Sequence, residues 1–168
     1  MKKTFSGVFA QLLFPMLVAG ATLVATSCSK DEPTATAKQD FSAADDATIQ
    51  KYLTANNITN AKKQTSGLYY IPVTTNPNGL QATAGRTVTV KYAGTLLNGN
   101  AFDSGTFAFP LGAKQVIAGW DEGIALMRLS EKSILLIPSA LAYGSQSPSS
   151  AIPPNSVLRF EVELTKIQ

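Results

Sequence analysis

The strongest constraint on the fold lies near the end of the chain, where apolar and polar side chains alternate almost without interruption over residues 157–164. Successive side chains of a β-strand point to opposite faces, so this segment is predicted to be a strand with one buried and one solvated face. Residues 87–93 alternate in the same way. Strands of this kind require a sheet that has one face covered by another element.

Further strands and one helix complete the predicted domain. The predicted strands are 68–74, 87–93, 101–104, 133–138 and 157–164, with turn sequences at 76–79 and 98–100. Residues 119–127 have acidic side chains near their start and apolar side chains at helical spacing, so they are predicted to form a short helix. The predicted fold is an antiparallel α+β domain in which this helix covers one face of the sheet.

A second helix is predicted closer to the N-terminus, over residues 44–56. Ser42 can cap it, because a serine hydroxyl accepts a hydrogen bond from a free backbone N–H at a helix start. Ile49, Tyr52 and Leu53 then fall on one face. Three roles stay open for this helix: packing on the domain, spacing the domain from a membrane, and dimerisation.

Residues 1–27 have the features of a secretory signal peptide. Lys2 and Lys3 give a positively charged start, and the stretch 8–25 is largely apolar. A transmembrane helix is the alternative, but the stretch is shorter than the ~20 apolar residues that cross a bilayer, and Pro15 interrupts it. The signal peptide is therefore favoured, and export of the chain is expected.

The only cysteine, Cys28, stands three residues after the end of this apolar stretch. Together with residues 24–27 it resembles a bacterial lipobox, in which the cysteine carries diacylglycerol. We therefore expect a lipid anchor at Cys28 and a location in the cell envelope, on the outer membrane, facing the periplasm or the outside. Residues 29–32 resemble a tract that directs some lipoproteins to the outer face, although a solvated linker explains them equally well. Residues 28–41 are predicted to be a flexible tether, since they contain few large apolar groups.

Charge and residue content exclude several classes of function. The net charge of +3 includes Lys2 and Lys3; without them twelve basic residues face eleven acidic ones, and no basic cluster typical of nucleic-acid binding is present. Histidine is absent and the one cysteine is assigned to lipid, which excludes a His-containing triad, a cysteine nucleophile and the usual zinc sites. Neither a Walker-type loop nor a GxGxxG motif occurs. No cofactor or metal is predicted.

Several short segments point to one known family. They are Val90-Lys91-Tyr92-Ala93-Gly94, Phe102-Asp103-Ser104, Val116-Ile117-Ala118-Gly119-Trp120-Asp121-Glu122-Gly123, Ala142-Tyr143-Gly144, Ile152-Pro153-Pro154-Asn155 and Phe160-Glu161-Val162-Glu163-Leu164. In identity, order and spacing they resemble the FKBP-type peptidyl-prolyl cis/trans isomerases over residues 66–168. The resemblance implies a strongly bent antiparallel β-sheet wrapped around one short α-helix, with residues 42–65 as an N-terminal helical extension. It implies an enzyme that acts on proline-containing polypeptides and assists the folding of exported proteins, with a macrolide as a candidate ligand.

The resemblance also assigns a pocket. The catalytic residues that it implies are Tyr92, Asp103, Trp120, Tyr143 and Phe160. The substrate-binding residues that it implies are Phe102, Phe107, Val116, Ile117 and Ile152. The resemblance also implies that Trp120 forms the floor of the pocket and that the Ile117 N–H donates a hydrogen bond to a substrate carbonyl. Taken alone, the apolar members are more typical of a core, whereas Asp103 is a polar group directly after a core-type phenylalanine.

Some segments depart from the family pattern. Residues 104–107 form a shorter segment than in many members, 145–151 lacks the glycines and the aromatic or histidine often found there, and Ala140 stands where an acidic residue is common. These differences bear on substrate preference and macrolide affinity more than on the fold. Two other functions stay open: a catalytically weak module that binds proline-containing segments, and a purely structural surface lipoprotein.

Overall fold

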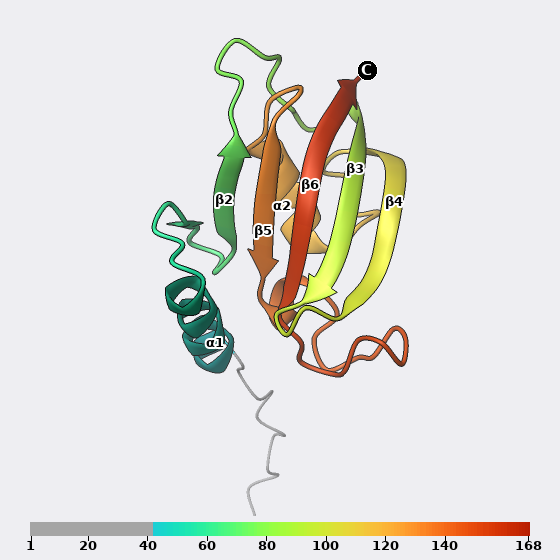
Figure 1. The fold of residues 1–168 in the computed structure, drawn as a ribbon. Coiled ribbons are helices and arrows are strands. Elements are labelled where there is room, and N and C mark those ends of the chain that lie inside the picture. Colours follow the sequence, from blue (N-terminus) through green and yellow to red (C-terminus); the bar gives the residue numbers. More distant parts are fainter. Residues whose placement is uncertain (1–41) are drawn as a thin grey trace, which may run out of the picture. The chain divides into compact units, whose positions relative to one another are not determined.

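The computed structural model describes residues 42–168, which form one antiparallel sheet with a helix, α2, on one of its faces and a second helix, α1, beside it (Figure 1). The strands are β1 Lys62–Lys63, β2 Tyr69–Thr74, β3 Thr87–Leu96, β4 Ala101–Pro110, β5 Lys132–Ile137 and β6 Leu158–Ile167. They lie in the order β1-β2-β5-β6-β3-β4, and all neighbours pair antiparallel. No helix in this part of the chain is long and apolar enough to cross a bilayer. The predicted signal peptide, Cys28 and the tether lie outside the described residues.

The main core lies between the sheet and the short helix α2, Ala118–Ala125. β6 alternates as its sequence predicts, because Leu158, Phe160, Val162 and Leu164 are buried and the residues between them are more exposed. Ile124 of α2 is fully buried against this face of the sheet. The predicted α+β fold, an antiparallel sheet curled around one short helix, is confirmed.

Two glycines allow α2 to pack closely on β5. A Cβ at Gly119 would lie 2.4 Å from Ile137 Cγ2, and a Cβ at Gly123 would lie 2.7 Å from Leu135 Cδ1. Residues four apart share one face of a helix, so both glycines face the sheet. This close approach also sets the position of Trp120, which directly follows Gly119.

Two strands differ most from the sequence-based expectation, whereas β3 and β6 only run three residues beyond their predicted ends and α2 ends two residues before its predicted end. β4 continues from the predicted segment 101–104 as far as Pro110, and most of its side chains are exposed. An edge strand with so few buried positions lacks the apolar alternation on which strand prediction depends. β1 is only two residues long and both are exposed, so its sequence has no apolar alternation from which a strand could be predicted.

Helix α1 spans Ser42–Ala55, so it begins and ends slightly earlier than predicted and includes Ser42. Its apolar residues Ile49 and Leu53 are buried in a second cluster on the domain. The other buried members of that cluster are Tyr69, Ile71, Leu136 and Val157. Of the three roles left open for this helix, packing on the domain is the one that the structure shows.

Candidate active site

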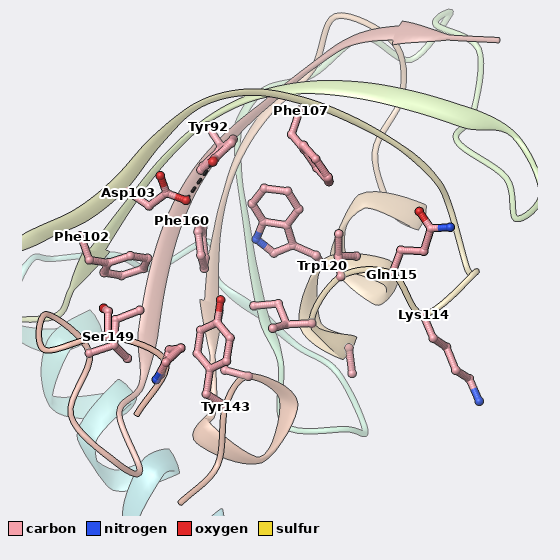
Figure 2. A pocket seen from close by; sticks show the side chains of 16 residues that line it. Tyr92, Phe102, Asp103, Phe107, Lys114, Gln115, Trp120, Tyr143, Ser149 and Phe160 are labelled. Atoms are coloured by element: carbon pink, nitrogen blue, oxygen red, sulfur yellow. Dashed lines mark hydrogen bonds between the residues drawn. The ribbon is translucent and has the colours of Figure 1, made fainter. Parts of the chain in front are cut away.

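One pocket brings together all the side chains that the sequence assigns to the site (Figure 2). Its volume is about 760 Å³, within the ~300–1,000 Å³ typical of ligand sites. The predicted residues that line it are Tyr92, Phe102, Asp103, Phe107, Val116, Ile117, Trp120, Tyr143, Ile152 and Phe160. They come from β3, β4, the end of the loop before α2, α2 itself, the loop between β5 and β6, and β6. The fold thus gathers residues that are far apart in the sequence.

Four aromatic rings form the inner wall of the pocket. The Trp120 ring lies at 4.9 Å and 75° from the Tyr92 ring, and at 5.2 Å and 81° from the Phe160 ring. Phe102 meets Phe160 at 5.4 Å and 83°. Edge-to-face pairs of this kind are the favoured aromatic geometry. Trp120 and Phe160 are buried, yet both reach the pocket surface, so the wall is both core and binding surface.

Gly94 makes room for two of these rings. It lies on β3, opposite Asp103 of β4 on one side and Phe160 of β6 on the other. A Cβ at this position would lie 2.6 Å from Phe102 Cε2 and 2.8 Å from Phe160 Cε1. The T-shaped contact between the two phenylalanines therefore depends on the missing side chain.

A β-bulge explains how Asp103 joins the pocket next to Phe102. Consecutive residues of a regular strand point to opposite faces. The pairing of β3 with β4 shifts here, from Gly94 opposite Asp103 to Thr95 opposite Ala101. Such a bulge re-aims side chains, and both Phe102 and Asp103 line the pocket. Sequence alternation could not have revealed this.

Asp103 is held by a hydrogen bond. The Tyr92 hydroxyl donates to Asp103 Oδ2 at 2.8 Å (Figure 2). Burial raises the pKa of Tyr92 above its ordinary value, and the hydrogen bond to Asp103 raises it further. Tyr92 therefore stays protonated at neutral pH and keeps donating to the carboxylate, which remains at the exposed rim.

The Trp120 indole nitrogen is buried and has no hydrogen-bond partner within the described part of the chain. In Figure 2 this nitrogen lies on the side of the ring that faces Phe160. The two rings meet edge to face, with their centroids 5.2 Å apart. This N–H is the one polar group that Trp120 brings to the floor of the pocket.

The rim of the pocket carries the more exposed side chains. Tyr143 lies shortly after a single turn of 3-10 helix, η1, Ser139–Leu141, and the residue is 37% exposed. Phe107 is 46% exposed and stacks on Phe109. Ile152 is a buried residue of the loop between β5 and β6. Ile117 stands just before α2, where backbone N–H groups have no partner within the helix.

Several further residues line the pocket that the sequence did not indicate. They are Lys114, Gln115, Ala118, Ala142, Pro148 and Ser149. The loop that carries the first two is held by Asp121 of α2, whose carboxylate accepts hydrogen bonds from the N–H groups of Gly112 and Lys114 at 2.9 and 3.0 Å. Their closeness to predicted residues in the sequence was the only signal that could have found them.

The arrangement suits an apolar ring that is flanked by carbonyl groups. The floor and walls are aromatic, and polar groups other than the Trp120 N–H stand only at the rim. Among residues 42–168, no group of three or more His, Cys, Asp or Glu side chains is placed to hold a metal ion. A proline ring and the amide bond before it have the shape and polarity that such a pocket accommodates.

Comparison with known proteins agrees with this geometry. A family model described as FKBP-type peptidyl-prolyl cis-trans isomerase matches residues 79–165, a span that contains every predicted pocket residue. The fold and pocket are therefore those of a prolyl isomerase domain. The chain belongs to the FKBP family of peptidyl-prolyl cis/trans isomerases.

Individual relatives show the extent of the similarity. FK506-binding protein 1 of Dictyostelium discoideum is 52% identical over 85 residues, which cover 48% of this chain and 79% of that protein. Peptidyl-prolyl cis-trans isomerase Fkbp12 of Drosophila melanogaster is 38% identical over 107 residues, which cover 61% of this chain and 99% of that protein. The crystal structure of FkpA from Escherichia coli superposes with a TM-score of 0.63 at 34% identity, covering 76% of this chain and 61% of that chain.

Proposed function

We propose that this isomerase acts on proline-containing segments of exported proteins, by binding the prolyl amide twisted out of plane, while a lipid at Cys28 holds it in the cell envelope. The proposed catalysis is supported by one observation: an open pocket brings together the aromatic residues Trp120, Phe160 and Tyr92 with the polar residues Asp103 and Tyr143. The names of relatives as FK506-binding proteins support a macrolide as a second ligand of this pocket.

The proposed mechanism follows from the electronic structure of the amide. Its partial double bond gives a rotation barrier of about 18–20 kcal/mol. In the twisted state conjugation is lost, so the amide is less polar than when it is planar. A dry aromatic pocket therefore favours the twisted state over the planar one, and each ~1.36 kcal/mol of preferential binding gives about tenfold in rate.

Each polar group has a role in this proposal. Tyr143 and the Ile117 N–H donate hydrogen bonds to substrate carbonyl groups, which fix the chain on either side of the rotating bond. Asp103, held by Tyr92, adjusts the electrostatic potential at the rim. Trp120 and Phe160 supply the shape and exclude water. None of these roles requires a nucleophile or proton transfer.

A protease-coupled assay of a prolyl peptide tests the proposed roles. We expect Asp103→Val and Tyr143→Phe each to lower kcat/KM by about tenfold, equal to ~1.4 kcal/mol of transition-state stabilisation. Thr106→Val is the matched control, because Thr106 is exposed on the same edge strand and does not line the pocket. Parental activity in both pocket variants would refute these roles. A parent chain that suppresses aggregation but leaves isomerisation at its spontaneous rate would favour a binding module.

The lipid anchor is tested separately, since Cys28 lies outside the described residues. We expect the parent chain, expressed in a bacterium, to incorporate a radiolabelled fatty acid and to sediment with membranes. Cys28→Ser should lose the label, because the sulfur that would receive the lipid is absent. Isomerase activity should be the same in both forms. A parent chain that incorporates no label, or a Cys28→Ser chain that still incorporates it, would contradict the anchor.

A further inference from the structure

The loop between β5 and β6 supplies one side of the pocket. It leaves β5 after Ile137 and enters β6 at Leu158. Its contributions to the pocket are Ala142, Tyr143, Pro148, Ser149 and Ile152. Residues 145–151 are all exposed, so the loop depends on its two ends for a fixed position.

Helix α1 holds the first end of this loop through Asp45. This residue is only 5% exposed, and its Oδ2 accepts hydrogen bonds from the Ser139 N–H at 2.8 Å and from the Ser139 hydroxyl at 2.7 Å. A buried carboxylate is unfavourable unless it is hydrogen-bonded, and hydrogen bonds to a charged oxygen are stronger than neutral ones. The position of Ser139 is therefore closely coupled to that of α1.

Ser139 in turn is bonded to both neighbours of Tyr143. Its carbonyl oxygen accepts hydrogen bonds from the N–H groups of Ala142 at 3.0 Å and Gly144 at 2.8 Å. The Gly144 carbonyl then accepts from the Asn155 N–H at 2.7 Å, which ties this turn to the returning part of the loop. A shift of Ser139 would consequently move Tyr143.

The second end of the loop is also held by α1. Val157, directly before β6, is buried in the cluster that contains Ile49 and Leu53 of α1. The same cluster contains Leu136, close to the point where the loop leaves β5. One helix thus contacts the loop at both ends, through a carboxylate at one and an apolar cluster at the other.

We propose that Asp45 is a positioning residue for prolyl isomerisation, and that α1 fixes the active-site loop so that the Tyr143 hydroxyl meets the substrate. Helix α1 lies before residues 79–165, the part that the family model matches. The N-terminal extension that contains α1 would then contribute to catalysis by holding the active-site loop in place. This inference rests on the role of Tyr143 put forward above.

The experiment uses the full chain with Asp45→Ala and the milder Asp45→Asn, which keeps the size of the side chain. Loss of the Asp45 contacts should lower kcat/KM by about three- to tenfold, as expected when a substrate-binding group loses its fixed position. The Gly144 amide hydrogen should exchange about tenfold faster with solvent, because its hydrogen bond to Ser139 opens more often. Asp45→Asn should fall between the parent and Asp45→Ala on both measures.

The matched control is Asp46→Ala. Asp46 is the next residue of the same helix, but it accepts a hydrogen bond from the Tyr69 hydroxyl and pairs with Lys63, away from the loop. This variant should lose thermal stability without changing kcat/KM or the exchange of the Gly144 amide. It separates weaker docking of α1 from loss of the loop contact.

A double variant tests whether Asp45 acts through Tyr143. When Tyr143→Phe has removed the hydroxyl, Asp45→Ala should cause no further loss of activity, since coupled residues are not additive. A full additional loss in that background, parental activity of Asp45→Ala, or parental exchange of the Gly144 amide would each overturn the inference. If Tyr143→Phe alone keeps parental activity, the proposed role of Tyr143 fails, while the exchange measurement still decides whether Asp45 holds the loop.

Discussion

Phe160→Ala is expected to lower kcat/KM for prolyl isomerisation by about 100-fold, because loss of one wall of a preorganised site misplaces the bound substrate. The Phe160 ring contacts the rings of Trp120 and Phe102 and lies on the inward face of β6. Without it, water enters the pocket and the aromatic wall loses its central member. Parental kcat/KM in this variant would contradict the proposed mechanism.

The variant also loses stability, which has to be separated from catalysis. Truncation of a buried phenylalanine lowers the free energy of unfolding by about 3–5 kcal/mol, and small domains are typically stable by only about 5–15 kcal/mol. The assay is therefore run at low temperature, and the measured activity is divided by the fraction of molecules that are folded. Leu164→Ala is the matched control. Leu164 is fully buried on the same face of the same strand but does not line the pocket. It should lose a comparable ~2–5 kcal/mol of stability while each folded molecule keeps parental activity.

Gly119→Val is expected to give the largest loss of stability from an added side chain, at least about 3 kcal/mol, the upper part of the range for overpacked cores. The added Cβ would start 2.4 Å from Ile137 Cγ2, on a branched and fully buried side chain that cannot swing away. Helix α2 must therefore move off β5. The midpoint of thermal unfolding should fall by roughly 10 °C or more.

A spectroscopic signal accompanies this loss. Trp120 is the only tryptophan and directly follows Gly119, so its fluorescence reports the position of the pocket floor. We expect the fluorescence emission of Gly119→Val to be red-shifted, because the Trp120 ring becomes more exposed to water. Gly105→Val is the control, because Gly105 lies on the exposed edge strand and its nearest neighbour, Tyr92 Oη, would be 3.7 Å from the new Cβ. Equal stability of the two variants would show that the contact with Ile137 is unimportant.

The sequence alone predicts those parts of the fold in which apolar residues recur at the regular spacing of a strand or a helix. Alternation along β6 and β3 predicted which residues face the core, and the spacing around Trp120 predicted α2. The pocket residues came from the family resemblance, because a buried aromatic in a core and one in a binding site look alike in a single sequence.

Other features could not be predicted, for identifiable reasons. Phe109 is the one buried residue of β4, so the strand shows no alternation. The bulge that places Asp103 beside Phe102 depends on the register between two strands, which local sequence does not encode. The contact of Asp45 with Ser139 joins residues 94 positions apart, and an acidic residue early in a helix is already explained by the helix dipole.

The strand order has a consequence for biosynthesis. The C-terminal strand β6 fills the gap between β5 and β3, with nine residue pairs to β3 and six to β5. Until that strand has left the ribosome, both neighbours present open edges, and open edges invite pairing with other chains. The nascent protein must therefore be kept apart from other chains until β6 has joined the sheet, so that a folding catalyst of this design is itself prone to aggregation while it is being made.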